Sequence, residues 1–156
     1  MASKQCNSSS YIFHEAISHC RWKTVLKKFL KTINIKDYQH HSFEEIMISI
    51  YEKCKDIKGI GMLTVYDITA GICRHYHLKI EKVYIVGNGP KRAIQILKLK
   101  PKVQKIGKTR LRYVNMGDIL VSLDKCKANI NPKIRKSMDG DAMESYLCNW
   151  QKTIKK

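Results

Sequence analysis

The stretch that decides the fold runs from Cys54 to Val65 and reads CKDIKGIGMLTV. Apolar residues recur at helical spacing on both sides of it, so it is expected to join two helices. Gly59 and Gly61 would end the first helix and allow a sharp turn. The second helix would then begin near Met62 with backbone N–H groups that have no acceptor inside the helix. Such a helix start attracts anions, and a nucleic-acid phosphate is one of them.

The helices around this stretch can be delimited from the pattern. Ser42 followed three residues later by Glu45 is a capping box, which predicts a helix from Phe43 toward Ile57. The next helix is expected over residues 62–76. An amphipathic helix with lysines on its polar face is expected earlier in the chain, over residues 11–33.

The stretch resembles the helix-hairpin-helix DNA-binding motif, whose hairpin reads apolar-x-Gly-apolar-Gly before a second helix. Residues 57–61 match this pattern, and Thr64 matches the Ser or Thr often found near the start of the second helix. The resemblance covers residues 44–76, about a fifth of the chain. It implies a mainly α fold and a largely sequence-independent contact with the DNA backbone.

The resemblance also implies which groups would bind. Backbone N–H groups of the hairpin and of the next helical turn would hold the phosphate, and Lys58 would add a charge. These N–H groups belong to Gly59, Gly61, Leu63 and Thr64. A monovalent cation often binds hairpin carbonyl groups, here those of Lys55, Ile57 and Ile60. The alternative is an ordinary helix–helix hairpin whose glycines serve only close packing.

A second glycine pair lies at residues 86–93, which read VGNGPKRA. It fits the hairpin pattern less well, because Asn88 replaces the apolar residue and residues 83–86 do not read as a helix. The alternative is a glycine-rich anion site at a helix N-terminus. Both interpretations assign phosphate binding to the same residues, which are Gly87, Gly89, Lys91 and Arg92.

The charge of the chain is high and uneven. The formal net charge is +17, and residues 89–136 hold 14 Lys and Arg against two Asp, hence +12. Such a segment repels itself unless a partner relieves it, so we expect nucleic acid as the partner, with double-stranded DNA preferred because of the motif. Tyr113 is a candidate for stacking on a base. The expected basic surface consists of Lys100, Lys102, Lys105, Lys108, Arg110 and Arg112.

The expected fold is a compact, mainly α domain over residues 11–156, after a disordered segment at residues 1–10. Its hairpin core spans residues 42–99 and its basic segment residues 89–136. The pattern also allows a short strand pair, at residues 83–86 and 111–114. Further helices are expected over residues 90–99 and 117–126, from residue 133, and from Asp139 to the C-terminal region.

The compartment is expected to be intracellular and reducing. The chain has no run of 18 apolar residues and no secretory signal, so no membrane partner is expected. Its six cysteines are scattered without a C-x-x-C pair, which favours free thiols over disulfides. No zinc site is expected, because the cysteine and histidines of residues 73–77 have no second ligand pair.

Two other classes of function remain open. One is a DNA-repair glycosylase or lyase of the helix-hairpin-helix type. Its lyase members carry a catalytic Lys where this chain has Leu63, and only Glu81 lies near their catalytic Asp, so no catalytic residue is assigned. An acidic cluster at Asp139, Asp141 and Glu144 is better explained as a helix start than as a metal site. The other class is a protein-interaction module that docks on an acidic protein.

Overall fold

The computed structural model describes residues 11–154, and the chain divides into two compact units, residues 1–78 and residues 79–156. The sequence pattern predicted a single helical domain instead. The two glycine pairs therefore lie in different units, and each unit is described on its own. The segment at residues 1–10, expected to be disordered, lies outside the described residues.

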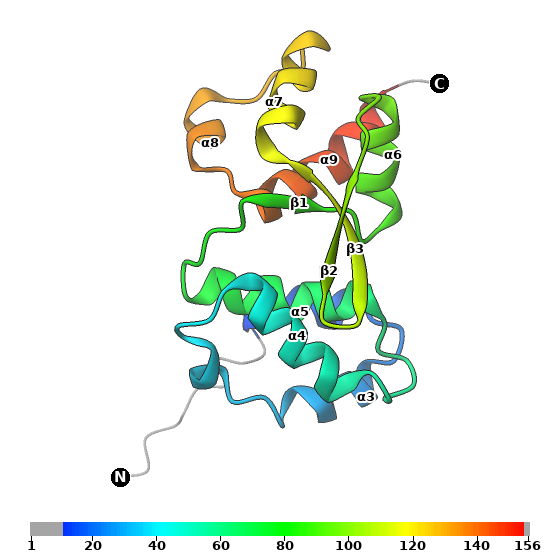
Figure 1. Cartoon of the computed structure of the whole chain (residues 1–156), viewed down its shortest axis with the longest axis vertical. Coiled ribbons are helices and arrows are strands. Elements are labelled where there is room, and N and C mark those ends of the chain that lie inside the picture. Colours follow the sequence, from blue (N-terminus) through cyan, green and yellow to red (C-terminus); the bar gives the residue numbers. More distant parts are fainter. Residues whose placement is uncertain (1–10, 155–156) are drawn as a thin grey trace. The chain divides into compact units, whose positions relative to one another are not determined.

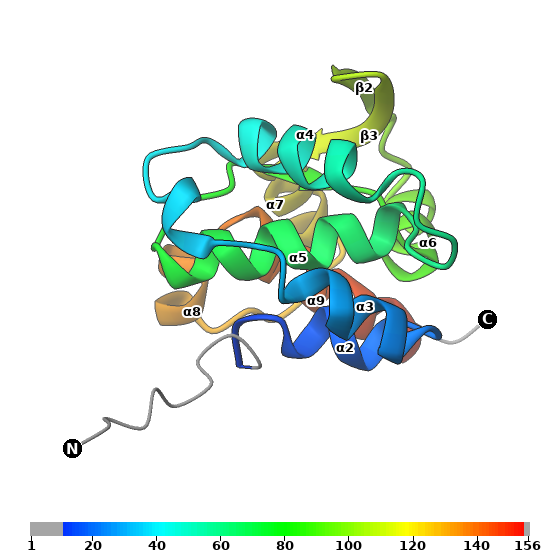
Figure 2. The same cartoon turned by 90° about the horizontal axis from the view of Figure 1, so that it is seen from below.

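The first unit is helical and is organised around one buried helix. In chain order it contains α2 (His14–His19), α3 (Lys23–Leu30), the 3-10 helix η1 (Ile35–Tyr38), α4 (Phe43–Cys54) and α5 (Met62–His75). Helices α2 and α4 both pack against α5 (Figure 2). Every residue of α5 from Thr64 to Cys73 is buried. An edge-to-face contact between Phe43 and Tyr66, with ring centroids 5.9 Å apart, joins α4 to α5.

The helices on both sides of the hairpin begin as expected. The Ser42 hydroxyl accepts the N–H of Glu45, and the Ser42 N–H donates to the Glu45 carboxylate at 2.7 Å. This backbone hydrogen bond lowers the pKa of Glu45 because it favours the ionised carboxylate. The predicted capping box is therefore confirmed, and α5 differs from its predicted range by one residue.

The single helix predicted over residues 11–33 is wrong. The chain leaves the helix at Cys20, which has extended backbone angles, and α3 begins only at Lys23. The break brings Cys20 and Trp22 against the turn at Gly59. Tertiary packing thus interrupts a periodicity that is continuous in the sequence. The segment between α3 and α4 contains the short 3-10 helix η1.

The second unit packs helices on one face of a small antiparallel sheet. Its elements are β1 (Lys82–Tyr84), α6 (Asn88–Ile96), β2 (Lys102–Ile106), β3 (Thr109–Asn115), α7 (Met116–Lys125), α8 (Pro132–Ser137) and α9 (Gly140–Thr153). The strand order is β1-β3-β2 (Figure 1). A buried cluster joins Val83 and Val114 of the sheet to apolar residues of α6, α7 and α9.

The strand pair allowed by the sequence is present. Strand β1 pairs with β3, with Val83 opposite Val114. Strand β2 was not predicted: it pairs with β3 from Lys102–Tyr113 to Ile106–Thr109. The connecting turn is Gly107-Lys108. Gly107 has φ +59, and a positive φ at only the first of the two turn residues is the type II′ hairpin turn.

The chain is mainly helical, but its helices are short. Within residues 11–154, none is long and apolar enough to cross a bilayer.

The cysteines give a direct check on burial. None of the five described cysteines forms a disulfide, and Cys20, Cys54 and Cys73 are buried while Cys126 is exposed. Burial raises the pKa of Cys54 to about 11, so this thiol stays protonated and unreactive at pH 8. We expect iodoacetamide to label Cys126 in the native protein and Cys54 only after denaturation, as read by peptide mass spectrometry. Equal labelling rates at Cys54 and Cys126 in the native protein would contradict the packing of α4.

Candidate nucleic-acid interface

The hairpin between α4 and α5 is a tight turn of backbone hydrogen bonds. The N–H of Ile57 donates to the carbonyl of Cys54 at 2.9 Å, and the N–H of Ile60 donates to the carbonyl of Ile57 at 3.2 Å. Gly59 has φ +96, a conformation that an L side chain rarely adopts. Ile57 and Ile60 are half-buried. The sequence therefore predicted both the position of the turn and the residue that makes it possible.

Gly59 is also the point where the rest of the unit approaches the turn. A Cβ atom at this position would lie 2.5 Å from Cγ of Trp22, so the indole packs directly on the glycine backbone. The Cys20 thiol lies 3.8 Å from the Gly59 carbonyl. The Trp22 side chain nevertheless remains about half exposed, at 49%. Trp22 is a part of this region that the sequence pattern did not indicate.

Gly61 has a different role, because it is the N-cap of α5. Its backbone is extended, at φ −99 and ψ −179, and no side chain caps the helix. The first helical hydrogen bond runs from the N–H of Val65 to the Gly61 carbonyl at 3.1 Å. The N–H groups of Met62, Leu63 and Thr64 therefore have no acceptor within the helix. A Cβ atom at Gly61 would meet nothing within 4 Å, so the space beside this cap residue is open, while Thr64 in the first turn is only 7% exposed.

The side chains around the hairpin carry both signs of charge. Lys58 is exposed and forms no ion pair with any described residue. Lys55 instead donates to Glu52 at 2.6 Å, and this hydrogen bond raises the pKa of Lys55 above its usual range. Of the three carbonyl groups assigned to a cation, the one of Ile57 already accepts the N–H of Ile60. Lys58 is thus the hairpin lysine that is free to meet a phosphate.

The contact between Gly59 and Trp22 gives a test of the turn. We expect Gly59→Ala to destabilise the first unit by about 1–3 kcal/mol, because it strains the backbone and displaces the indole. Gly61→Ser is the matched control, since its side chain has open space and serine is a good N-cap. Thermal unfolding should be followed by tryptophan fluorescence. Equal melting temperatures for the two variants would show that the turn is built differently.

A hydrogen bond that the sequence pattern did not reveal ties α2 to α5. His19 Nδ1 lies 3.0 Å from Asp67 Oδ2, and the Asp67 side chain is only 7% exposed. Its partner is 48 residues away in sequence, so no local pattern could have paired the two. This bond holds the end of α2, and with it the segment that carries Trp22, beside the first turns of α5.

The second glycine pair opens helix α6. Gly87 is its N-cap, with no side-chain cap, and the preceding element is strand β1. A helix-hairpin-helix would need a helix there, so the helix N-terminus is the interpretation that fits. Gly89 faces α9, and a Cβ atom there would lie 2.6 Å from the Cys148 sulfur. Gly89 is therefore required for the close packing of α6 on α9.

The structure brings this helix start together with part of the basic segment. A cavity of about 390 Å³ is lined by Gly87, Asn88 and Lys91 from the start of α6, by Arg112 from β3, and by apolar residues such as Ile94. The N–H of Ile85 donates to the Arg112 carbonyl at 2.9 Å, which fixes the strand at this point. Lys91 and Arg112 are exposed and form no ion pair with any described residue. Arg92 is exposed as well.

Strands β2 and β3 together form the β2–β3 ribbon. The remaining basic residues lie on its two faces, in its turn or just before it. Residues opposite each other in this ribbon share a face, and the register pairs Lys105 with Arg110 and Val103 with Arg112. We call these four residues the cationic face. Lys102 is on the opposite face, Lys108 is in the turn, and Lys100 precedes β2. All six predicted basic residues are exposed.

Tyr113 has two side-chain neighbours within the second unit, Lys82 and Tyr84. It lies on the ribbon face opposite the cationic face, where Lys82 Nζ is 4.9 Å from its ring centroid. The Tyr84 ring is 6.2 Å away. Lys82 also donates to Gln104 at 2.9 Å, so the aromatic ring belongs to an internal polar cluster. Tyr113 is half-buried beside these neighbours, and its stacking on a base stays a prediction.

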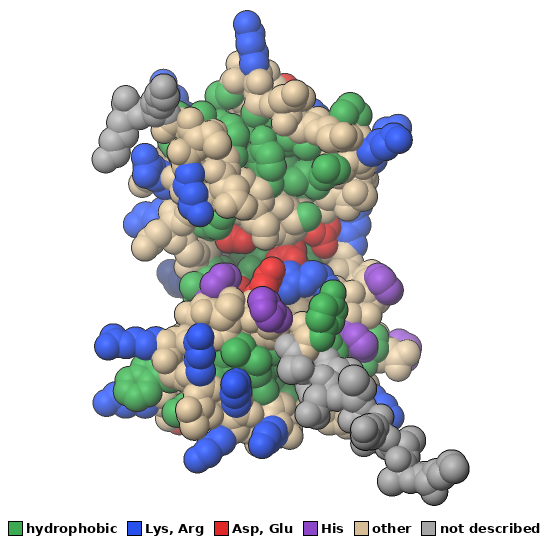
Figure 3. Space-filling model, turned by 180° about the vertical axis from the view of Figure 1, so that it is seen from behind, with side chains coloured by type: hydrophobic (Ala, Val, Ile, Leu, Met, Phe, Trp, Pro, Cys, Tyr) green, Lys and Arg blue, Asp and Glu red, His purple; other side chains and the backbone are tan. Residues whose placement is uncertain are grey.

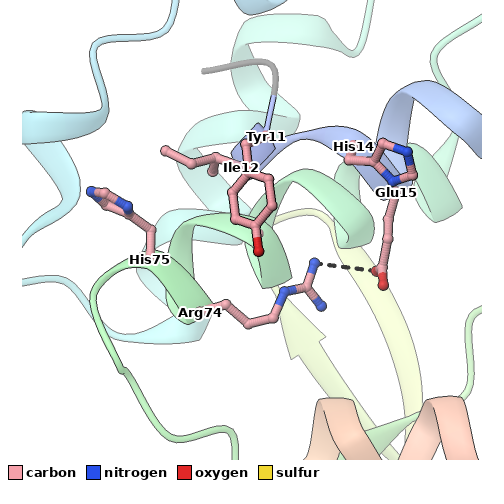
Figure 4. A pocket seen from close by; sticks show the side chains of 7 residues that line it. Tyr11, Ile12, His14, Glu15, Arg74 and His75 are labelled. Carbon is pink, nitrogen blue, oxygen red and sulfur yellow. Dashed lines mark hydrogen bonds and ion pairs between the residues drawn. The ribbon is translucent and has the colours of Figure 1, made fainter. Parts of the chain in front are cut away.

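A further pocket lies between α2 and α5, with a volume of about 370 Å³ (Figure 4). Arg74 donates to Glu15 at 3.2 Å across it, and His14 and His75 lie at its sides. The two opposite charges compensate each other, so this pocket adds nothing to an anion-binding surface. Lys and Arg side chains stand out around the surface drawn in Figure 3, and a group of Asp and Glu side chains is visible on the same face.

Leu63 stands in the first turn of α5, and Glu81 belongs to the other unit. The Asp139 carboxylate caps α9 by accepting the Ala142 N–H at 2.9 Å, as the helix-start interpretation predicted. Within the described residues, no group of three or more His, Cys, Asp or Glu is placed to hold a metal ion.

Comparison of the chain with protein-family models, with curated proteins and with solved structures gives no match.

Proposed function

We propose that the protein binds duplex DNA through the phosphate backbone, largely independently of sequence, in the manner of a helix-hairpin-helix motif. The observation that carries this proposal is the open start of α5. Its first-turn N–H groups have no helical acceptor, its cap residue Gly61 has no side chain, and the helix dipole favours an anion there. Lys58 adds a positive charge beside it.

Two further features, one in the second unit and one of the whole chain, support the same proposal. The start of α6 combines free N–H groups with Lys91 and Arg112 around one cavity. The net charge of +17 supplies the long-range attraction to a polyanion. A monovalent cation at the carbonyl groups of Lys55, Ile57 and Ile60 would be an auxiliary part of the hairpin.

The test is a fluorescence-polarisation titration with three labelled probes. They are a 20-base-pair DNA duplex, its single strand and an RNA duplex of the same sequence. We expect the DNA duplex to bind most tightly, because a helix-hairpin-helix motif usually binds the backbone of double-stranded DNA. If the protein binds none of these probes but binds an acidic polypeptide such as polyglutamate, the protein-interaction alternative is favoured.

A further inference from the structure

The β2–β3 ribbon extends beyond the three-stranded part of the sheet. Strand β1 pairs with β3 at residues 113–115, and its last backbone hydrogen bond reaches Arg112. From Arg112 to the turn at Gly107, the ribbon has only two strands in the described part of the chain. The cationic face is exposed on this two-stranded part, whereas Ile106 and Leu111 on the opposite face are buried.

The cationic face destabilises the folded protein when no partner is bound. Lys105 and Arg110 are directly opposite each other, and like charges in this arrangement are destabilising. None of Lys105, Arg110 and Arg112 forms an ion pair with a described residue. Val103 lies among them with 60% of its surface exposed. Three unpaired cations around an exposed apolar side chain indicate a face that is completed by an anionic partner.

The dimensions of the ribbon fit the major groove of duplex DNA. The major groove of B-DNA, about 12 Å wide, admits a two-stranded β-ribbon. Residues on the same face of a strand, such as Arg110 and Arg112, are about 6.8 Å apart, which corresponds to about two nucleotide steps of one strand along the duplex axis. Arginine is suited to the O6 and N7 atoms of guanine, and an apolar side chain to the thymine methyl group.

Other nucleic acids fit this face less well. The major groove of an A-form RNA helix is too deep and narrow for side chains to read. Single strands are bound mainly by aromatic stacking, and the cationic face has no aromatic residue because Tyr113 is on the other side.

We propose that the β2–β3 ribbon inserts its cationic face into the major groove of duplex DNA. This inference rests on the proposed function and deepens it, because it adds contact with base edges to a backbone-binding protein. Arg110 and Arg112 contact guanine, Lys105 contacts a neighbouring phosphate or base edge, and Val103 contacts a thymine methyl group. The start of α6, which shares a cavity with Arg112, lies against the adjoining backbone.

The test compares two duplexes of one sequence that differ only in the major groove. In one of them the cytosines are replaced by glucosylated 5-hydroxymethylcytosine, which obstructs that groove and leaves the phosphates unchanged. We expect the wild-type protein to bind the unmodified duplex at least about tenfold more tightly. Saturating distamycin, which occupies the minor groove, should leave this ratio unchanged.

Two triple variants distinguish the effect of the cationic face from the effect of net charge. Lys105→Thr, Arg110→Thr and Arg112→Thr together should abolish the preference for the unmodified duplex. The control, Lys100→Thr, Lys102→Thr and Lys108→Thr, removes the same charge from the same segment but spares the cationic face. It should weaken binding to both duplexes equally and keep the ratio. Threonine maintains strand propensity in both variants.

The outcomes are distinct. No binding of the wild-type protein to either duplex would overturn the proposed function itself. Equal binding of the wild-type protein to both duplexes would overturn major-groove insertion and leave backbone binding intact. Loss of the preference in the control variant as well would show that charge, and not the cationic face, produces it.

Discussion

Raising the salt concentration from 50 to 200 mM is expected to weaken duplex binding by about 10³-fold or more. Each neutralised phosphate releases counterions, and about six contacts produce a loss of this size. The six exposed residues of the basic segment, together with the two helix starts, offer enough contacts for this number. The measurement is a series of polarisation titrations, plotted as the logarithm of affinity against the logarithm of salt concentration.

The triple variant of the cationic face provides the control for this slope. It removes three cations, so the slope should become shallower by about 2–3 units if each cation meets one phosphate or displaces one counterion. A nearly flat response of the wild-type protein would contradict backbone binding, because an uncharged interface does not release counterions.

Gly61→Asp is expected to weaken duplex binding about 100-fold or more while leaving the fold at least as stable. The backbone at Gly61 is extended and a new Cβ meets open space, so the carboxylate can cap α5. It would then occupy the N–H groups of Leu63 or Thr64 and repel a phosphate. Two lost hydrogen bonds to a charged group are worth about 3–6 kcal/mol, which corresponds to this loss of affinity.

The opposite signs of the two effects make this variant informative. A good N-cap adds a few tenths of a kcal/mol to helix stability, and its negative charge adds to this at the positive end of the dipole. Thermal unfolding and affinity should therefore move in opposite directions. Unchanged affinity in Gly61→Asp would remove α5 from the interface, and a less stable protein would mean that Gly61 is not an open N-cap. Lys133→Gln on α8, which also lowers the net charge by one, controls for the change in net charge.

The features that could be predicted from sequence are those that local rules determine. The capping box at Ser42 and Glu45 and the turn at Gly59 depend on side chains within a few residues of each other. The helix start at Asp139 has the same origin, and local strand propensity also indicated the segments around Val83 and Val114, although their pairing is a long-range contact. Local propensity and spacing are enough to place such elements.

What could not be predicted depends on contacts between distant segments. The helix breaks at Cys20 because this residue and Trp22 pack on Gly59, nearly 40 residues later. Strand β2 is rich in lysine and shows little alternation, and only its pairing with β3 makes it a strand. The cavity that joins Arg112 to the start of α6 follows from the same pairing.

The most direct measurement is a ¹⁵N-¹H NMR titration of the protein with the 20-base-pair duplex, following the backbone amides at the start of α5. We expect the amide signals of Leu63 and Thr64 to shift strongly and in proportion to binding, because these N–H groups would donate to a phosphate. The same signals should not shift in Gly61→Asp at equal duplex concentration. Saturated duplex binding with unchanged amide signals from Met62 to Thr64 in the wild-type protein would contradict anion capture at this helix.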